Sequence, residues 1–139
     1  MPEIAVDTGP LVALFDGAER HHAAAVAFLR RSEGPIVTNV AVLTEAAALL
    51  DFSDELPAEF LVWASKALLI DGKTDSDLPR IAAIMRKYKD LPADFADASL
   101  VALCERRNIE KIATLDRAFG IYRTAKRRAL QNIFFELDG

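Results

Sequence analysis

The sequence of 139 residues contains only one cysteine and two histidines. The single cysteine, Cys104, cannot form an internal disulfide, and we expect it to be buried because it lies in the apolar run SLVALC. His21 and His22 are adjacent, with no third histidine or cysteine at the spacing of a zinc site. Both histidines are therefore expected on the surface. These absences exclude a disulfide framework and a zinc centre.

Long hydrophobic runs are also absent. No stretch approaches the roughly 18 uninterrupted apolar residues that a membrane span requires. The start, MPEIAVDTGP, lacks the basic, apolar and small-residue zones of a signal peptide. We therefore expect a cytoplasmic protein without membrane contact. Apolar residues make up 52% and charged residues 27%, which excludes disordered and fibrous chains, and the length fits one domain over residues 1–139.

The formal net charge of −4 at pH 7 gives no support for a nucleic-acid-binding protein when it is averaged over the chain. The distribution is uneven, however, because residues 80–139 hold 12 Lys and Arg against 8 Asp and Glu. A local basic cluster could contact phosphates, although such a run is as readily a solvated face. The cluster consists of Arg123, Lys126, Arg127 and Arg128.

Short apolar runs alternate with longer stretches of helical period, which indicates an α/β domain with a central, mainly parallel sheet of about five strands flanked by helices. The apolar runs predict strands at residues 3–7, 35–38, 68–70 and 111–115, and an edge strand at 133–137. The helical period predicts helices at residues 11–16, 21–31, 40–52, after Pro57, and at 76–90 and 93–107.

Two aspartates stand at the ends of predicted strands. Asp7 ends the first strand and is followed by Thr8, whereas Asp116 follows KIATL, in which Thr114 stands two residues before it. Sites in open α/β sheets form at the carboxyl ends of the strands. In a parallel sheet, Asp7 and Asp116 therefore belong to the same edge.

Three further acids lie in or next to largely apolar helical segments. Glu45 has apolar neighbours throughout VAVLTEAAALL. Asp94 and Asp97 share one helix face at a spacing where their negative charges repel each other. A cation bound between the two carboxylates would remove this repulsion. Each acid taken alone is more simply an N-cap or a solvated carboxylate. Together with the two strand-end aspartates, they predict one acidic pocket.

Carboxylate oxygens without a histidine or cysteine partner suit Mg²⁺ or Mn²⁺. One or two such ions can activate a water and neutralise charge on a phosphoryl group. The pattern therefore predicts metal-dependent hydrolysis of nucleic acid, with basic residues outside the pocket holding the backbone. Arg117, beside Asp116, and Arg123 are the candidates for that contact, although Arg117 fits a solvated position equally well.

Three segments carry a resemblance that spans nearly the whole chain: DTGPLVALFD, TNVAVLTEAAALL and LPADFADASLVALCERRNIEKIATLDRAF, in this order. On these segments the chain resembles the PIN-domain family, in particular the toxins of VapBC-type toxin–antitoxin pairs. The resemblance implies that an acidic metal site is formed by Asp7, Glu45, Asp97 and Asp116. It also implies Asp94 as an additional acid, and Thr8 and Thr114 as residues whose hydroxyls support the site.

The resemblance further implies a parallel five-stranded sheet, endoribonuclease activity with Mg²⁺ or Mn²⁺, frequent homodimers and a small VapB-like antitoxin that blocks the site. A PIN-domain ribonuclease outside a toxin–antitoxin operon is the main alternative. A phosphoacceptor domain would need two adjacent acids after the first strand and a lysine after the last core strand, whereas Asp7 is single and Asp116 takes the later place. The complete set of acids argues against a non-catalytic binding module.

Overall fold

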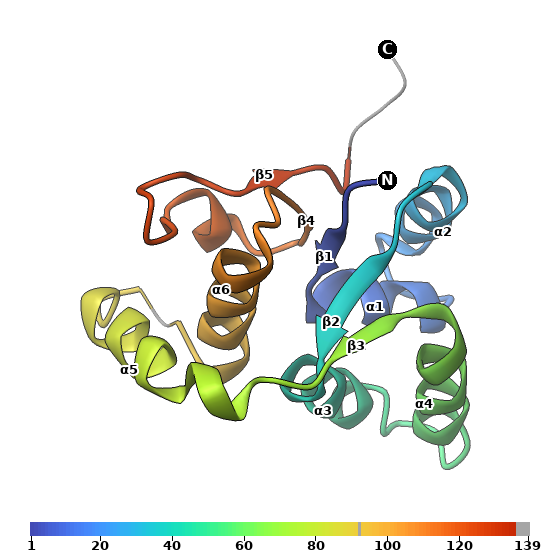
Figure 1. Cartoon of the computed structure of the whole chain (residues 1–139). Coiled ribbons are helices and arrows are strands. Elements are labelled where there is room, and N and C mark those ends of the chain that lie inside the picture. The colour runs from blue at the N-terminus through green and yellow to red at the C-terminus, as the bar shows by residue number, and fades with distance from the viewer. Residues whose placement is uncertain (92, 136–139) are drawn as a thin grey trace.

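The computed structural model describes residues 1–91 and 93–135 (Figure 1). Its described residues form one sheet of five strands, all paired in parallel: β1 (Ile4–Val6), β2 (Ile36–Asn39), β3 (Leu69–Asp71), β4 (Lys111–Ala113) and β5 (Gln131–Asn132). The strand order is β3-β2-β1-β4-β5, so β1 is central. The predicted parallel sheet of about five strands is confirmed.

The described chain also forms six α-helices and two short 3₁₀ turns. They are α1 (Thr8–Phe15), α2 (His22–Arg31), α3 (Val40–Leu49), α4 (Leu56–Ala67), η1 (Asp75–Asp77), α5 (Leu78–Lys87), α6 (Phe95–Arg107) and η2 (Arg117–Gly120). In Figure 1, α5 and α6 lie together to the left of the central strands, and α1, α2 and α4 lie to the right. No helix in the described part of the chain is both long and apolar enough to cross a membrane.

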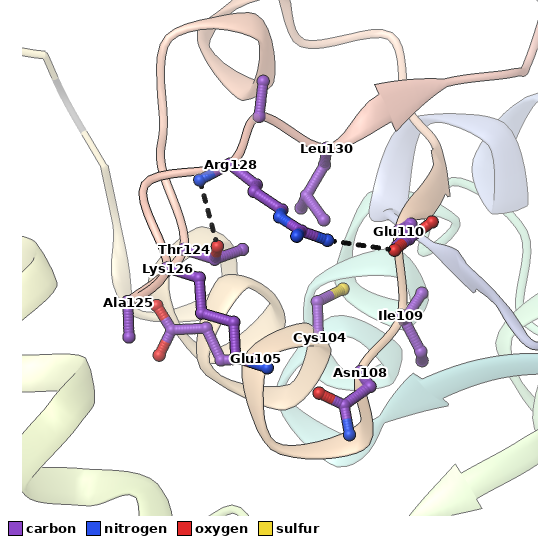
Figure 2. Close-up of a pocket in the computed structure, with 11 residues that line it drawn as sticks. Cys104, Glu105, Asn108, Ile109, Glu110, Thr124, Ala125, Lys126, Arg128 and Leu130 are labelled. Carbon is purple, nitrogen blue, oxygen red and sulfur yellow. Dashed lines mark hydrogen bonds and ion pairs between the residues drawn. The ribbon is translucent and has the colours of Figure 1, made fainter.

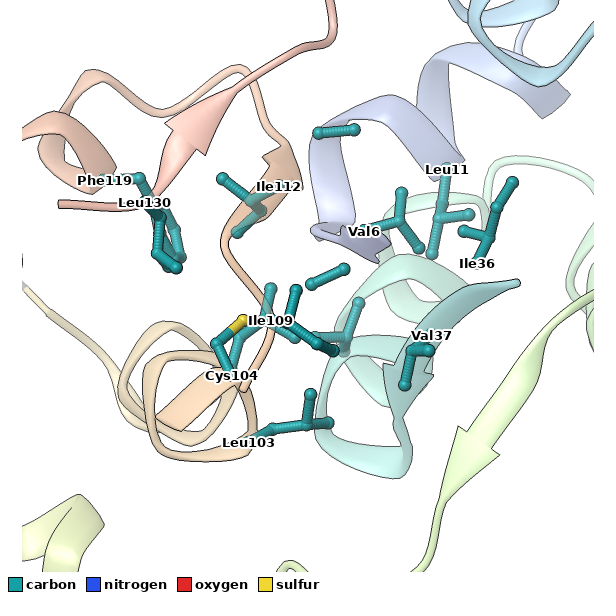
Figure 3. Packing of buried hydrophobic residues seen from close by; sticks show 14 of the residues in the cluster. Val6, Leu11, Ile36, Val37, Leu103, Cys104, Ile109, Ile112, Phe119 and Leu130 are labelled. Carbon is teal, nitrogen blue, oxygen red and sulfur yellow. The ribbon is translucent and has the colours of Figure 1, made fainter. Parts of the chain in front are cut away.

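The core surrounds the three inner strands. Val6, Val37 and Ile112 come from β1, β2 and β4 and are at most 1% exposed. All four residues of β2 are buried, as is usual for parallel strands covered by helices on both faces. Figure 3 shows these side chains together with Cys104. The expectation that Cys104 is buried is confirmed.

The predicted edge strand at residues 133–137 is placed too late in the chain. The strand observed is β5, whose two residues are exposed where it pairs with β4 at the sheet edge. Ile133 and Phe134 follow it and are buried, so the apolar run marks the segment that packs into the core after the strand. Residues 136 and 137 of the predicted strand lie outside the described residues.

The two histidines are half-buried, so the prediction that both lie on the surface is wrong. Nδ1 of His22 donates to the carbonyl of Ala13 at 2.8 Å. The His21 ring packs edge-on against Phe135 with 5.3 Å between ring centroids. Both side chains therefore serve packing around the start of α2.

An ion-pair network joins the end of α6 to the edge of the sheet. Asp71, the last residue of β3, is 3% exposed and accepts hydrogen bonds from Arg106 at 2.8 and 3.0 Å and from Arg107 at 3.0 Å. Arg106 also donates to Asp77 at the start of α5, and Arg107 donates to Glu3 just before β1. Two neighbouring arginines thus connect four parts of the fold.

Acid is expected to weaken the fold through Asp71. Hydrogen bonds from Arg106 are the main cause that lowers the pKa of Asp71 from 3.8 to about 2. Because the folded-state pKa lies below the unfolded value, the carboxylate stabilises the fold above pH 4 and this contribution is lost as the pH falls toward 2. The shift corresponds to about 2 kcal/mol.

Urea denaturation of the wild type and Asp71→Asn at several pH values tests this expectation. The difference between their free energies of unfolding should be largest at neutral pH and should shrink between about pH 4 and pH 2. A difference that stays constant over this range would show that the ionised carboxylate is not its source.

Candidate active site

The carboxyl ends of β1 and β4 open onto one cavity of about 430 Å³. Asp7 follows β1 and stands at the N-cap of α1, and Asp116 lies three residues beyond the end of β4. We call it the acidic cavity, after the carboxylates that line it: Asp7, Glu19, Glu45, Asp94, Asp97 and Asp116. The structure thus brings together all five acids that the sequence suggested for the site.

Thr114 connects the two strand ends. Its buried hydroxyl donates to Asp7 Oδ2 at 2.8 Å and accepts from the backbone N–H of Asp116 at 2.9 Å. Residue 114 lies next to β4, so this pair of hydrogen bonds fixes Asp7 relative to the turn that carries Asp116. The position of Thr114 agrees with the supporting role that the resemblance implies for it.

The second carboxylate oxygen of Asp7 receives no hydrogen bond from residues 1–91 or 93–135. Asp7 is only 4% exposed, and its Oδ1 has no hydrogen-bond partner among the described residues. The hydroxyl of Thr8, also buried, has none either. A buried carboxylate oxygen without a partner is costly, because it loses its hydration and gains nothing in return. Asp7 Oδ1 is therefore a place where a cation fits the chemistry of the cavity.

Asp94 and Asp97 form a reciprocal cap at the start of α6. Asp94 Oδ1 accepts from the backbone N–H of Asp97 at 2.9 Å, and Asp97 Oδ2 accepts from that of Asp94 at 3.4 Å. Asp116 similarly accepts from the backbone N–H of Ala118 at 2.9 Å. The N-cap interpretation is thus correct for Asp94 and Asp116, whereas Asp97 is the third helical residue of the reciprocal cap. Each of these caps leaves the second carboxylate oxygen outside it.

The carboxylates act on one another through their charges. Burial is the main cause that raises the pKa of Asp7 to about 6, and the charges of Asp116 and Asp94 raise it further, whereas the Thr8 backbone and the hydrogen bond from Thr114 lower it. Burial and then the charges of Asp7 and Asp94 raise the pKa of Asp97. The carboxylates of the cavity therefore repel one another, and Asp7 and Asp97 ionise less readily than they would in water.

Glu45 contributes to the same field from the middle of α3. Its side chain is half-buried, and its pKa is raised first by burial and then by the charges of Asp94 and Asp7. Glu45 therefore faces the acidic cavity from an otherwise largely apolar segment.

No three acidic, histidine or cysteine side chains within the described ranges converge closely enough to hold one ion together. The caps explain this spacing, because Asp94, Asp97 and Asp116 each accept a hydrogen bond from the backbone of their own turn. The acids surround a common space, and joint binding of an ion requires some of them to rotate toward it. Their donor set, composed of carboxylate oxygens alone, suits Mg²⁺ or Mn²⁺.

The rest of the cavity wall includes residues that the sequence patterns did not indicate. Glu19 lies in the loop before α2, where no periodicity marks it, and its Oε2 accepts from the backbone N–H of His21 at 2.6 Å. Val12 and Leu49 form an apolar side of the cavity. Only the complete fold places these three residues beside the acids.

The two arginines suggested for phosphate contact do not line the acidic cavity. Arg117 is exposed on η2, directly after Asp116. Arg123 Nη1 donates to the carbonyl groups of residues 120–122 at 2.7 to 3.0 Å, so its guanidinium is occupied by its own turn. Contact of either side chain with a phosphate stays a prediction.

Much of the basic cluster borders a second cavity, of about 480 Å³, at the C-terminal end of α6. Lys126 and Arg128 line it together with Glu105 and Glu110, and Arg128 pairs with Glu110 at 3.5 Å (Figure 2). This cavity shares no lining residue with the acidic cavity among the described residues. The acidic side chains here neutralise much of the positive charge, which favours the solvated-face interpretation of the cluster.

A family model of the PIN domain matches residues 4–126. The chain belongs to the PIN domain family. The resemblance drawn from the three sequence segments is thereby confirmed, and the matched range contains every acid suggested for the site. This PIN domain is 32% identical over 115 residues to Ribonuclease VapC26 of Mycobacterium tuberculosis. The aligned region covers 81% of this chain and 85% of VapC26.

Solved structures show that the PIN domain has the same fold as other members. VapC20 of Mycobacterium tuberculosis is described as a toxin that cleaves the sarcin-ricin loop. Its structure matches with a TM-score of 0.76 at 19% identity, and the match covers 82% of this chain and 90% of the VapC20 chain. VapBC2 from Rickettsia felis, bound to a DNA fragment from its promoter, has a TM-score of 0.58 at 15% identity, with 84% and 90% covered. FitAcB from Neisseria gonorrhoeae has a TM-score of 0.56 at 13% identity, with 81% and 87% covered.

Proposed function

We propose that this PIN domain is a metal-dependent endoribonuclease of the VapC type, the toxin of a toxin–antitoxin pair, which hydrolyses RNA phosphodiester bonds with Mg²⁺ or Mn²⁺. The observation that carries the proposal is the acidic cavity, in which the buried Asp7 lies beside other carboxylates and one of its oxygens has no donor in the described part of the chain. The identity of 32% to a ribonuclease supports the choice of RNA as substrate.

The acids have different parts in the proposed site. We assign metal binding to Asp7, Glu45, Asp97 and Asp116, with Asp94 as an additional acid. Asp7 is the most rigidly held of them, because Thr114 fixes one oxygen and burial restricts the other. A bound divalent ion would supply activation of the attacking water and neutralisation of phosphoryl charge.

The remaining side chains support these acids and the substrate. Thr114 keeps Asp7 oriented, and the unpartnered hydroxyl of Thr8 lies beside it in the cavity wall. Because the carboxylates alone would repel a phosphodiester, cationic groups are needed at the rim. We propose Arg117 for this contact, because it is exposed and directly follows Asp116, whereas Arg123 would have to leave the carbonyl groups that it now contacts.

An apolar groove of about 630 Å³ adjoins the acidic cavity and supports the proposed protein partners. Val40 and Phe95 line this groove, and their side chains are 61% and 43% exposed. Glu45 and Asp94 line both the groove and the acidic cavity. Exposed apolar surface of this kind commonly marks a protein interface. We propose that a second copy of the chain packs here as a homodimer, and that a small VapB-like antitoxin blocks the acidic cavity.

Metal removal tests the proposed activity. Purified protein incubated with a mixed RNA pool should cleave it when Mg²⁺ or Mn²⁺ is present and should stop when a chelator is added, because the acids cannot bind a phosphodiester without a cation. Activity should return when the metal is restored in excess. Cleavage that continues undiminished in chelator would contradict the proposal.

A further inference from the structure

The side chain of Asn132 continues the sheet at the point where β5 ends. Asn132 is the last residue of β5, and its backbone pairs with Ile112 of β4 (Figure 1). One step further along, the amide of Asn132 takes the place of a strand residue. Its Nδ2 donates to the carbonyl of Thr114 at 3.1 Å, and its Oδ1 accepts from the backbone N–H of Thr114 at 3.3 Å. A single amide therefore bonds both backbone groups of Thr114.

The Asn132 amide is itself held by the segment that follows it. Its Oδ1 also accepts from the backbone N–H of Phe134 at 3.1 Å, which forms an Asx turn. The carbonyl groups of Ile133 and Phe134 accept hydrogen bonds from Arg31 at the end of α2, and both residues are buried. The opposite orientation of the amide would place its donors against two backbone N–H groups. The orientation of the Asn132 side chain is therefore fixed.

Thr114 connects Asn132 with the acidic cavity. Asn132 does not line that cavity, but the hydroxyl of Thr114 donates to Asp7 Oδ2 at 2.8 Å and accepts from the backbone N–H of Asp116 at 2.9 Å. Thr114 lies one residue beyond β4, where the pairing of β4 with β5 has ended. The amide of Asn132 thus supports the backbone of the one residue whose hydroxyl holds Asp7.

The bonds to Thr114 exceed what an Asx turn requires. Such a turn needs only the side-chain oxygen of Asn132 and the N–H of Phe134, and a serine can form a weaker turn of the same kind. The Nδ2 donor of Asn132 has no part in the turn and bonds Thr114. The position therefore distinguishes two roles, one in ending the strand and one in holding Thr114.

We propose that Asn132 is a positioning residue of the acidic cavity, whose amide fixes the backbone of Thr114 so that the Thr114 hydroxyl keeps Asp7 oriented for a divalent cation. The inference rests on the proposed function, because that function assigns metal binding to Asp7. Groups behind a metal ligand orient it, and their loss weakens metal affinity. Asn132 touches neither metal nor RNA in this role.

Mn²⁺ binding measured without RNA tests the proposal. Asn132→Ser keeps a side-chain oxygen for the turn but cannot bond both backbone groups of Thr114. We expect the Kd for Mn²⁺, measured by the electron paramagnetic resonance of free Mn²⁺, to rise at least about fivefold, because Asn132 acts one residue behind a group whose loss costs about 10- to 100-fold. The Mg²⁺ concentration for half-maximal RNA cleavage should rise similarly, with the maximal rate largely recovered at saturating metal.

Gln131→Ser is the matched control, because Gln131 is the neighbouring exposed residue of β5 and its side chain points to the opposite face of the sheet. Its Kd for Mn²⁺ should stay within about twofold of the wild type. If Asn132 only ends the strand, Asn132→Ser will lower the Tm and leave the Kd unchanged. That result, or equal weakening of Mn²⁺ binding in both serine variants, would overturn the proposal.

A double-mutant cycle tests whether Asn132 acts through Thr114. Thr114→Val removes the hydroxyl that holds Asp7, so adding Asn132→Ser to it should raise the Kd by less than about twofold. A full additional fivefold rise would rule out this route. The two serine variants decide the proposal even if Thr114→Val does not fold. In all these outcomes the wild type binds Mn²⁺ and cleaves RNA, whereas failure of the proposed function would appear as a wild type that does neither.

Discussion

Asp97→Asn is expected to abolish metal-dependent RNA cleavage while the protein stays folded. Asp97 shares the acidic cavity with Asp7, and the substitution removes its charge but keeps an oxygen that can accept the capping hydrogen bond of Asp94. Replacing a group behind a metal ligand already costs about 10- to 100-fold in affinity or activity, so loss of a ligand should cost at least about 100-fold. Initial cleavage rates at saturating Mg²⁺ measure the effect.

Asp54→Asn is the control for this loss. Asp54 is exposed in the turn between α3 and α4 and does not line the acidic cavity, so its neutralisation should leave the rate unchanged within about twofold. Thermal unfolding gives an independent readout, because Mg²⁺ should raise the Tm of the wild type and of Asp54→Asn more than that of Asp97→Asn. An Asp97→Asn variant that cleaves at the wild-type rate would remove this residue from the proposed site.

Arg106→Ala is expected to cost about 3 kcal/mol of the free energy of unfolding, at the lower end of the range for breaking a buried ion pair. Arg106 makes four hydrogen bonds, two to Asp71 and two to Asp77. Its removal leaves the buried Asp71 with Arg107 as its remaining arginine partner among the described residues. Most of the cost therefore comes from a carboxylate that is buried and only partly compensated.

Arg80→Ala tests whether burial is the cause. Arg80 also donates two hydrogen bonds of 2.8 Å, to the carboxylate of Glu105, but the Arg80 side chain is 38% exposed. The carboxylate of Glu105 is less deeply buried than that of Asp71. Loss of such a pair should cost about 1 kcal/mol or less. Urea denaturation at neutral pH compares the two variants, and equal losses would contradict the explanation by burial.

The parts of the fold that the sequence predicts well are those in which one local pattern carries the structure. Asp7 directly follows an apolar run that forms β1, and the parallel arrangement then brings it to the same edge as Asp116. The edge strand was misplaced for the corresponding reason. Gln131 and Asn132 form β5 while exposed, whereas the apolar residues after it belong to the core, so hydrophobicity marks the wrong segment.

The interactions that sequence reasoning missed join residues far apart along the chain. Asp71 and Arg106 are separated by 35 residues, and neither stands in a pattern that distinguishes a buried ion pair from a solvated surface. Glu19 was missed for the same reason, because a loop acid acquires meaning only beside the acidic cavity.

The strand order has a consequence for synthesis of the protein on the ribosome. The central strand β1 is made first, but its neighbour β4, beyond which Asp116 lies, comes from the last third of the chain. Because such distant contacts form only after both partners have emerged, a nascent chain exposes Asp7 and Glu45 long before Asp97 and Asp116 can join them. The carboxylates thus assemble only after residues 97–116 have left the ribosome.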